Sequence, residues 1–398
     1  MLRSQRKGIA VKQVAESRVT IQARLSAAMF RRLLAENPWP IVVGVLVPFV
    51  LITAWLQERG VTMGIVDAGG LLEFWVHGLF EPWSWVPYIH PPLYSVLMNS
   101  ADFYAGWFDV NIATVIIAHA ALAHALVVVF VGWFLWREFD ALWAQAGAAM
   151  VAFSPNWVRP FENYPLGSTL MALAAIAILN LASRGTWSAF VVAVFAALAA
   201  VELHLSNWFC IGGLMAGMFF LMPGRRLKAA FASILMIGLF MASTFPGLWQ
   251  VIEEGPDADA ESTMGGMTME WTNPLLYLPL VLVLLSPRVR GRRIAVVAAL
   301  GALLFTVVSF ALQHFQLADG QPYPYCLHYF ELVDTPLILA AVYVLAGWTG
   351  SQFRGGWRAS AAFAIGALLI FSQLALFCWG QRYVLLPGHS FLEVWQGL

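Results

Sequence analysis

Residues 67–94, DAGGLLEFWVHGLFEPWSWVPYIHPPLY, form a long polar interruption that follows the first apolar segment of membrane length. The stretch gathers carboxylates, histidines and tryptophans. It ends in His-Pro-Pro-Leu-Tyr, from His90 to Tyr94. Proline fits a helix only in its first turn, so two consecutive prolines end one helix and allow another to begin. The pattern predicts a fixed corner beside a loop where water and a lipid head group both reach a carboxylate.

The composition of the whole chain identifies its class. Of 398 residues, 60% are hydrophobic and 11% are charged, and the mean hydropathy is +0.74. A soluble domain carries roughly 25% charged residues, so the chain is expected to be a membrane protein. Its formal net charge is zero, and no overall field favours nucleic acid as a partner.

Apolar segments recur along the chain at a length that suits a bilayer. A hydrocarbon core of about 30 Å needs about 20 helical residues. The candidate segments are 39–56, 111–136, 141–154, 164–182, 187–203, 205–222, 229–249, 274–286, 294–313, 331–348 and 360–379. They predict an all-α, polytopic integral membrane protein with about eleven transmembrane helices. Segments 141–154 and 274–286 are short, and tilted or re-entrant forms stay open for them.

The chain divides into two parts. Residues 1–37 mix many basic residues with spaced apolar ones, which predicts a cytoplasmic amphipathic helix lying on anionic membrane lipids. Residues 38–398 are expected to form a single transmembrane domain.

Charge asymmetry predicts an orientation, because lysines and arginines of short loops stay cytoplasmic. With a cytoplasmic N-terminus, the inner loops hold the basic residues Arg137, Arg184, Arg225, Arg226, Lys228, Arg288, Arg290, Arg292, Arg293, Arg354 and Arg358. The outer loops then hold residues 67–94, the acidic run 253–270 and the loop 314–330. The same model leaves the C-terminus outside.

Three places within residues 39–222 resemble the GT-C superfamily of membrane glycosyltransferases. They resemble in particular the branch of protein mannosyltransferases and lipid A aminoarabinose transferases. The first place is the His-Pro-Pro-Leu-Tyr corner ending at Tyr94, after an acidic outer loop. The second is a Ser-Pro turn at Ser154, followed by a helix that starts at Tyr164. The third is His204, between two closely spaced apolar helices.

The resemblance implies an inverting glycosyltransferase of the bacterial inner membrane. Such an enzyme moves a sugar from a polyprenyl-phosphate donor to a glycan, lipid or protein acceptor on the outer face. Asp67, in an outer catalytic loop 57–110, would match the catalytic acidic residue. The chain departs from the family at two points. Ala68 stands where many members have a second acidic residue, and Glu162 replaces an expected arginine, the nearest being Arg159.

The chemistry of the transfer selects further candidates. A base must take a proton from the incoming hydroxyl or amine, and cations must hold the phosphate leaving group. Asp67 is the predicted base. The predicted substrate-binding residues are His90, Arg159, Glu162, Tyr164, His204 and Arg382. No cofactor or metal ligand set is expected, although Asp67 could hold a divalent cation.

Other interpretations of these residues stay open. Asp67 could cap a helix, because Asp is a preferred N-cap residue. Glu202 and His204 could pair with neighbouring helices at the membrane edge, and His119 and His124 favour helix packing over a shared metal.

Two other functional classes also stay open. The chain could be a non-catalytic assembly subunit of a membrane complex. It could instead be a lipid or solute transporter, which is expected to show intramembrane charges and broken helices.

Overall fold

The computed structural model describes most of the helical segments of the chain. The described residues are 100, 103–110, 112–154, 164–203, 207–243, 274–278, 280–281, 291–314, 334–349 and 357–385. Within these residues the regular structure is helical, and none of it is strand. The predicted all-helical class is confirmed for this part of the chain.

The helices follow the apolar segments. They are α5 Ile112–Glu138, α6 Ala141–Ala152, α7 Tyr164–Arg184, α8 Trp187–Leu203, α9 Asn207–Leu221, η2 Pro223–Arg225, α10 Arg226–Ser243, η4 Pro274–Tyr277, α13 Arg292–His314, α14 Asp334–Thr349 and α15 Trp357–Leu385. The short segment 141–154 does form a helix, α6, which begins where the Asp140 carboxylate accepts the Trp143 N–H at 3.0 Å. Segment 274–286 is described only in part, through η4 and a few residues after it.

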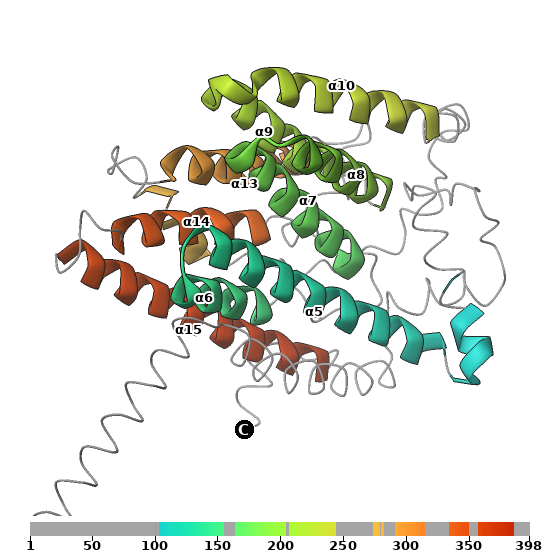
Figure 1. Cartoon of the computed structure of the whole chain (residues 1–398). Helices are drawn as coiled ribbons and strands as arrows, with labels where there is room; N and C mark the ends of the chain where they lie inside the picture. Colours follow the sequence, from blue (N-terminus) through green and yellow to red (C-terminus); the bar gives the residue numbers. More distant parts are fainter. Residues whose placement is uncertain are drawn as a thin grey trace, which may run out of the picture.

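The described helices lie roughly side by side in one stack (Figure 1). At one side is α10, which packs against α8 and α9. Next come α7 and α13, then α5 and α14, and α6 and α15 lie at the opposite side. The stack therefore brings α14, from late in the chain, beside the early helices α6 and α7.

Two described helices are long and apolar enough to cross a membrane: Pro223–Ser243 and Ala359–Leu376. The first buries one face, made of Ala229, Ala232, Met236 and Phe240, against the stack. Its other side exposes large apolar side chains, including Phe231 and Ile234. Contiguous exposed apolar surface is rare on soluble monomers, so this pattern favours contact with lipid.

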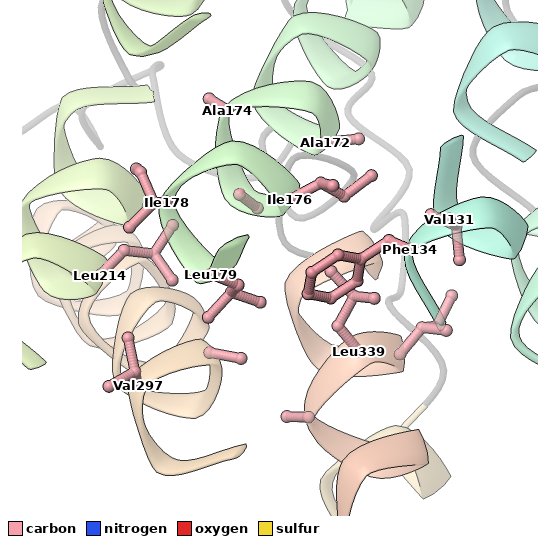
Figure 2. Close-up of a cluster of buried hydrophobic side chains, with 14 of the residues drawn as sticks. Val131, Phe134, Ala172, Ala174, Ile176, Ile178, Leu179, Leu214, Val297 and Leu339 are labelled. Carbon is pink, nitrogen blue, oxygen red and sulfur yellow. The ribbon is translucent and has the colours of Figure 1, made fainter. Parts of the chain in front are cut away.

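The centre of the stack is apolar and closely packed. Helix α7 supplies Ile178 and Leu179, which point toward Leu214 of α9 and Val297 of α13 (Figure 2). Helix α14 is buried along almost its whole length, from Asp334 to Trp348. A helix that is buried all round belongs to the interior of a bundle.

Glycines allow α9 and α13 to approach each other. A Cβ atom on Gly213 would lie 2.6 Å from the Leu300 carbonyl oxygen, and one on Gly301 would lie 3.0 Å from the Cys210 carbonyl oxygen. Gly217 follows four residues after Gly213, and a Cβ atom on it would lie 3.2 Å from the Val297 Cα atom. Small residues at this spacing are typical of helix contacts inside membranes.

Alanines supply much of the buried surface of α7 and α8, which pack against each other. The buried alanines on these two helices are Ala172, Ala174, Ala175, Ala177, Ala182, Ala189, Ala193, Ala197 and Ala200. Side chains this short allow neighbouring helices to approach closely.

Short connections make successive helices antiparallel, so the helix termini gather at two opposite ends of the stack. One end, called the basic end, holds Arg137, Arg184, Arg225, Arg226, Lys228, Arg292, Arg293 and Arg358. Two contacts tie these turns together: Arg225 donates to the Arg184 carbonyl at 3.0 Å, and Lys228 donates to the Gly185 carbonyl. The described residues thus agree with the predicted grouping of basic loops. Which membrane face they occupy stays a prediction.

The opposite end, called the polar end, holds Ser154, Glu202, Asn207, Ser243 and Asp334 at helix termini. Among the described lysines and arginines, only Arg382 lies on this side, because α15 begins at the basic end and Arg382 is in its last turn. Tyr164, the first residue of α7, also lies at the polar end.

Candidate functional site

Most of the predicted site residues lie outside the described residues. These are Asp67, His90, Arg159, Glu162 and His204. Tyr164 and Arg382 are placed by their backbones alone, both at the polar end. Their predicted roles therefore stay predictions, and so does the proximity of any of them to Asp67.

The polar end contains a buried carboxylate that is not among the predicted site residues. Asp334 is only 3% exposed and is the first residue of α14. Its Oδ2 accepts a hydrogen bond from the Ser154 hydroxyl at 2.5 Å. The positive end of the α14 macrodipole stabilises a negative charge at this position. The pair joins the turn after α6 to a helix 180 residues later in the chain.

Two further polar side chains fix the end of α6 beside this pair. The Nε2 atom of His124 on α5 lies 3.3 Å from the Ala152 carbonyl oxygen. The Nε2 atom of Gln373 on α15 donates to the Met150 carbonyl at 3.2 Å. These contacts satisfy carbonyls in the last turn of α6, which have no partner within their own helix. His124 is thus a packed helix residue, as predicted.

These contacts also show how far along the helices of the stack the Ser154–Asp334 pair lies. Helix α5 continues from His124 to Ile112 and α15 continues from Gln373 to Leu385, which is about 18 Å beyond the contact in each case at ~1.5 Å per residue. Figure 1 shows α5 and α15 extending past α6 on the same side. The Ser154–Asp334 pair is therefore set back from the outer ends of these two helices.

A pair of hydroxyl groups joins η4 to α13 near α14. The Tyr277 hydroxyl is 2.9 Å from the Thr306 hydroxyl of α13, and η4, which contains Tyr277, packs against α14. Hydroxyls can both donate and accept. The Ser154–Asp334 pair and the Tyr277–Thr306 pair each offer groups that could hydrogen-bond to a polyhydroxylated ligand.

A second buried carboxylate links α8 to α10 at the polar end. Glu202 of α8 accepts a hydrogen bond from Ser243 of α10, and it is 8% exposed. Nearby, Asn207 of α9 donates its amide N–H to the Ala200 carbonyl at 2.8 Å. The alternative prediction that Glu202 pairs with a neighbouring helix is confirmed.

The sequence held one usable signal for Asp334. The acid stands at the beginning of an apolar segment, in Asp334-Thr335-Pro336, a composition typical of a helix start. Because segment 331–348 is predicted to span the membrane, an acid near its beginning is a functional candidate. For its partner Ser154, the sequence predicts only a turn.

Within the residues that the structure describes, no group of three or more His, Cys, Asp or Glu side chains could hold a metal ion. Comparison with family models and with curated proteins gave no match. The function therefore rests on the chemistry of the chain itself.

Proposed function

We propose that the chain is a membrane glycosyltransferase of the GT-C type, which transfers a sugar from a polyprenyl-phosphate donor to an acceptor at the polar end. Asp67 is its general base, with His90, Arg159, Glu162, Tyr164, His204 and Arg382 around the donor and acceptor. The proposal includes about eleven membrane-crossing helices and an outward-facing polar end in the bacterial inner membrane.

One observation carries this proposal: most of the described basic residues lie at one end of the stack, whereas the described motif residues and the buried carboxylates lie at the other. Ser154 and Tyr164, which carry part of the family resemblance, share the polar end with the buried carboxylates Asp334 and Glu202. Arg382 is the described cation on that side, and a phosphate leaving group needs a cation there. Positive charge elsewhere gathers at the other end, as expected for cytoplasmic loops.

Helix lengths support a polytopic arrangement. The 27 residues of α5, 21 of α7 and 23 of α13 correspond to about 40, 31 and 34 Å at ~1.5 Å per residue. Each length matches or exceeds a hydrocarbon core of about 30 Å. The two helices that qualify as spans by composition, Pro223–Ser243 and Ala359–Leu376, lie on the two sides of the stack.

The Ser154–Asp334 pair suits a supporting role in this reaction. A lipid-linked sugar enters the site from the membrane, so a polar group set back between long apolar helices can receive sugar hydroxyls. The carboxylate of Asp334 accepts such hydrogen bonds strongly, because charged acceptors form shorter and stronger bonds than neutral ones.

A proton-coupled transporter is the second candidate, and Asp334 is the observation that favours it. A carboxylate buried among membrane helices is a functional candidate by default, and proton relays use such groups. The sequence predicts that charges cluster in loops, whereas Asp334 lies at the start of a buried helix. A transporter would move its substrate across the membrane without breaking the sugar–phosphate bond.

The deciding experiment incubates the purified, full-length protein in lipid vesicles with polyprenyl-phosphate sugars and a mixture of acceptors. Consumption of the donor, with release of polyprenyl phosphate, is the expected result. Transport of an intact solute without donor consumption would favour the transporter. Inactivity in both assays, with a partner protein co-purifying in fixed ratio, would favour the assembly subunit.

A further inference from the structure

Two turns lie side by side at the basic end. One is the turn 185–186 between α7 and α8, and the other is η2, which joins α9 to α10. Arg225 Nη2 donates to the Arg184 carbonyl at 3.0 Å, and Lys228 Nζ donates to the Gly185 carbonyl. Gly185 has a φ of 64°, and a side chain there would collide with the Arg225 guanidinium. These contacts hold the Arg225 guanidinium and the Lys228 ammonium in fixed positions.

Each of these cations keeps donors for another partner. Arginine has five N–H donors and the lysine ammonium has three. Lys228 uses one on Gly185, and Arg226 uses its Nε on the Phe219 carbonyl at 3.1 Å. In the part of the chain that the structure describes, no carboxylate pairs with Arg184, Arg225, Arg226 or Lys228. The turns thus present preorganised positive charge that lacks a counter-charge within these residues.

An exposed apolar surface begins directly beside these cations. The Trp187 ring is 65% exposed, and Lys228 Nζ lies 4.6 Å from its centre. Phe231 of α10 stacks on Phe190 of α8 with ring centres 5.7 Å apart and is itself exposed. The apolar face continues along both helices through Val191, Val192, Phe195, Ile234, Leu235 and Ile237.

We propose that these turns bind an anionic phospholipid. Its phosphate binds Arg184, Arg226 and Lys228, its glycerol region lies at Trp187, and its acyl chains follow the exposed faces of α8 and α10. Tryptophan is typical of this depth in a bilayer, and basic pockets beside membrane helices suit anionic head groups. Because Arg226 and Lys228 are already held by backbone carbonyls, these two side chains lose little freedom on binding. A free phosphate ion would leave the apolar part of this surface unused.

The test titrates phosphatidylglycerol into the full-length protein in detergent and counts bound lipids by native mass spectrometry. Phosphatidylcholine with the same acyl chains is the comparison lipid. We expect the anionic lipid to bind more tightly. Arg184→Gln and Arg226→Gln should each weaken that binding about fivefold, the share of one basic residue at an anionic surface.

Arg137→Gln is the matched control. It removes one charge at the same end of the stack, but its guanidinium lies over the Trp133 ring of its own helix at 4.3 Å. Affinity within twofold of the unchanged protein is expected for this variant. Thermal unfolding in detergent verifies that the Arg184 and Arg226 variants are folded, since both side chains are exposed.

Equal affinity for the two lipids would overturn the proposal, and so would an equal loss in all three variants. Displacement of phosphatidylglycerol by millimolar inorganic phosphate would also overturn it, because the site would then recognise phosphate without the chains. None of these outcomes depends on glycosyl transfer.

Discussion

The two ends of the stack use the same pairing of a serine with a carboxylate, but in different surroundings. At the basic end, Ser183 donates to both oxygens of Glu138 at 3.1 Å, and the acid is half-buried near basic turns. At the polar end, Ser154 donates to Asp334 at 2.5 Å, and the acid is buried at the start of an enclosed helix. Water can solvate the first carboxylate, whereas the second depends on its protein contacts.

This difference indicates which carboxylates deserve a functional interpretation. A half-exposed pair costs little to form and contributes little. Burial of a charge is costly unless hydrogen bonds compensate, so a bundle retains such a group only where its contacts stabilise it or its chemistry is needed. Asp334, and to a lesser degree Glu202, meet this description at the polar end.

The largest expected effect concerns the orientation of the two ends. In intact cells, an impermeant maleimide should label reduced Cys326, which lies in the predicted outer loop 314–330. A Thr186→Cys variant that lacks Cys326 should be labelled only after the membrane is opened, because Thr186 is exposed in a turn of the basic end. The reverse pattern would exchange the cytoplasmic and outer ends and remove the polar end as an outer active site.

The next effect concerns catalysis at the polar end. Asp67→Asn keeps the size and helix-capping ability of the side chain but removes its proton acceptor. Transfer should fall by about 10²-fold or more, the contribution of a general base, with donor binding retained. Glu138→Gln is the control, because it neutralises a carboxylate at the other end and should leave turnover unchanged. Near-normal turnover of purified Asp67→Asn would refute the catalytic role.

A third prediction concerns the contact between α9 and α13, which lies between the two ends of the stack. Gly213→Ala places a methyl group against the Leu300 carbonyl, which cannot move without shifting α13. Overpacking of this kind should lower the free energy of unfolding by about 1–3 kcal/mol. At the adjacent Gly212, a Cβ atom would meet nothing within 4 Å, so Gly212→Ala should be neutral or stabilise by up to ~1 kcal/mol. Thermal unfolding in detergent would compare them, and equal effects would contradict the close α9–α13 contact.

The smallest predicted effect tests the comparison of the two serine pairs directly. Ser154→Ala removes a hydrogen bond to a buried carboxylate and should cost about 1.5–2 kcal/mol of unfolding free energy. Ser183→Ala removes the equivalent bond from a half-buried carboxylate and should cost about 0.5 kcal/mol. Unfolding of the two variants in the same detergent gives the difference. A larger cost for Ser183→Ala would mean that the basic-end pair has the greater structural importance.

Sequence patterns predicted the helices well where an apolar run was bounded by charges. Segment 187–203 coincides with α8, and 205–222 differs from α9 by only a few residues. The structure of the short segment 141–154 could not be predicted, because length alone cannot distinguish a buried helix from a re-entrant one. The contacts of His124 and Gln373 with its last turn show that α6 packs among α5 and α15, and its course relative to the membrane stays a prediction.

The candidate site was less predictable, because its contacts join residues far apart in the chain. Helical periodicity cannot show that Ser154 meets Asp334, or that Glu202 meets Ser243. The Gly213-x-x-x-Gly217 pattern could have predicted the close approach of α9 to another helix, though not that α13 is the partner. For Asp67 and His90 the family resemblance remains the basis of the prediction.

The many buried alanines of α7 and α8 have a consequence for the entropic cost of packing these helices. In lipid, helix association gains no hydrophobic driving force from the exclusion of water, so the entropic cost of ordering side chains becomes decisive. Alanine has no rotamers to lose on burial. The alanines of α7 and α8 are therefore buried with little loss of side-chain conformational entropy, and the larger side chains beside them, such as Ile178 and Leu179, carry most of that cost.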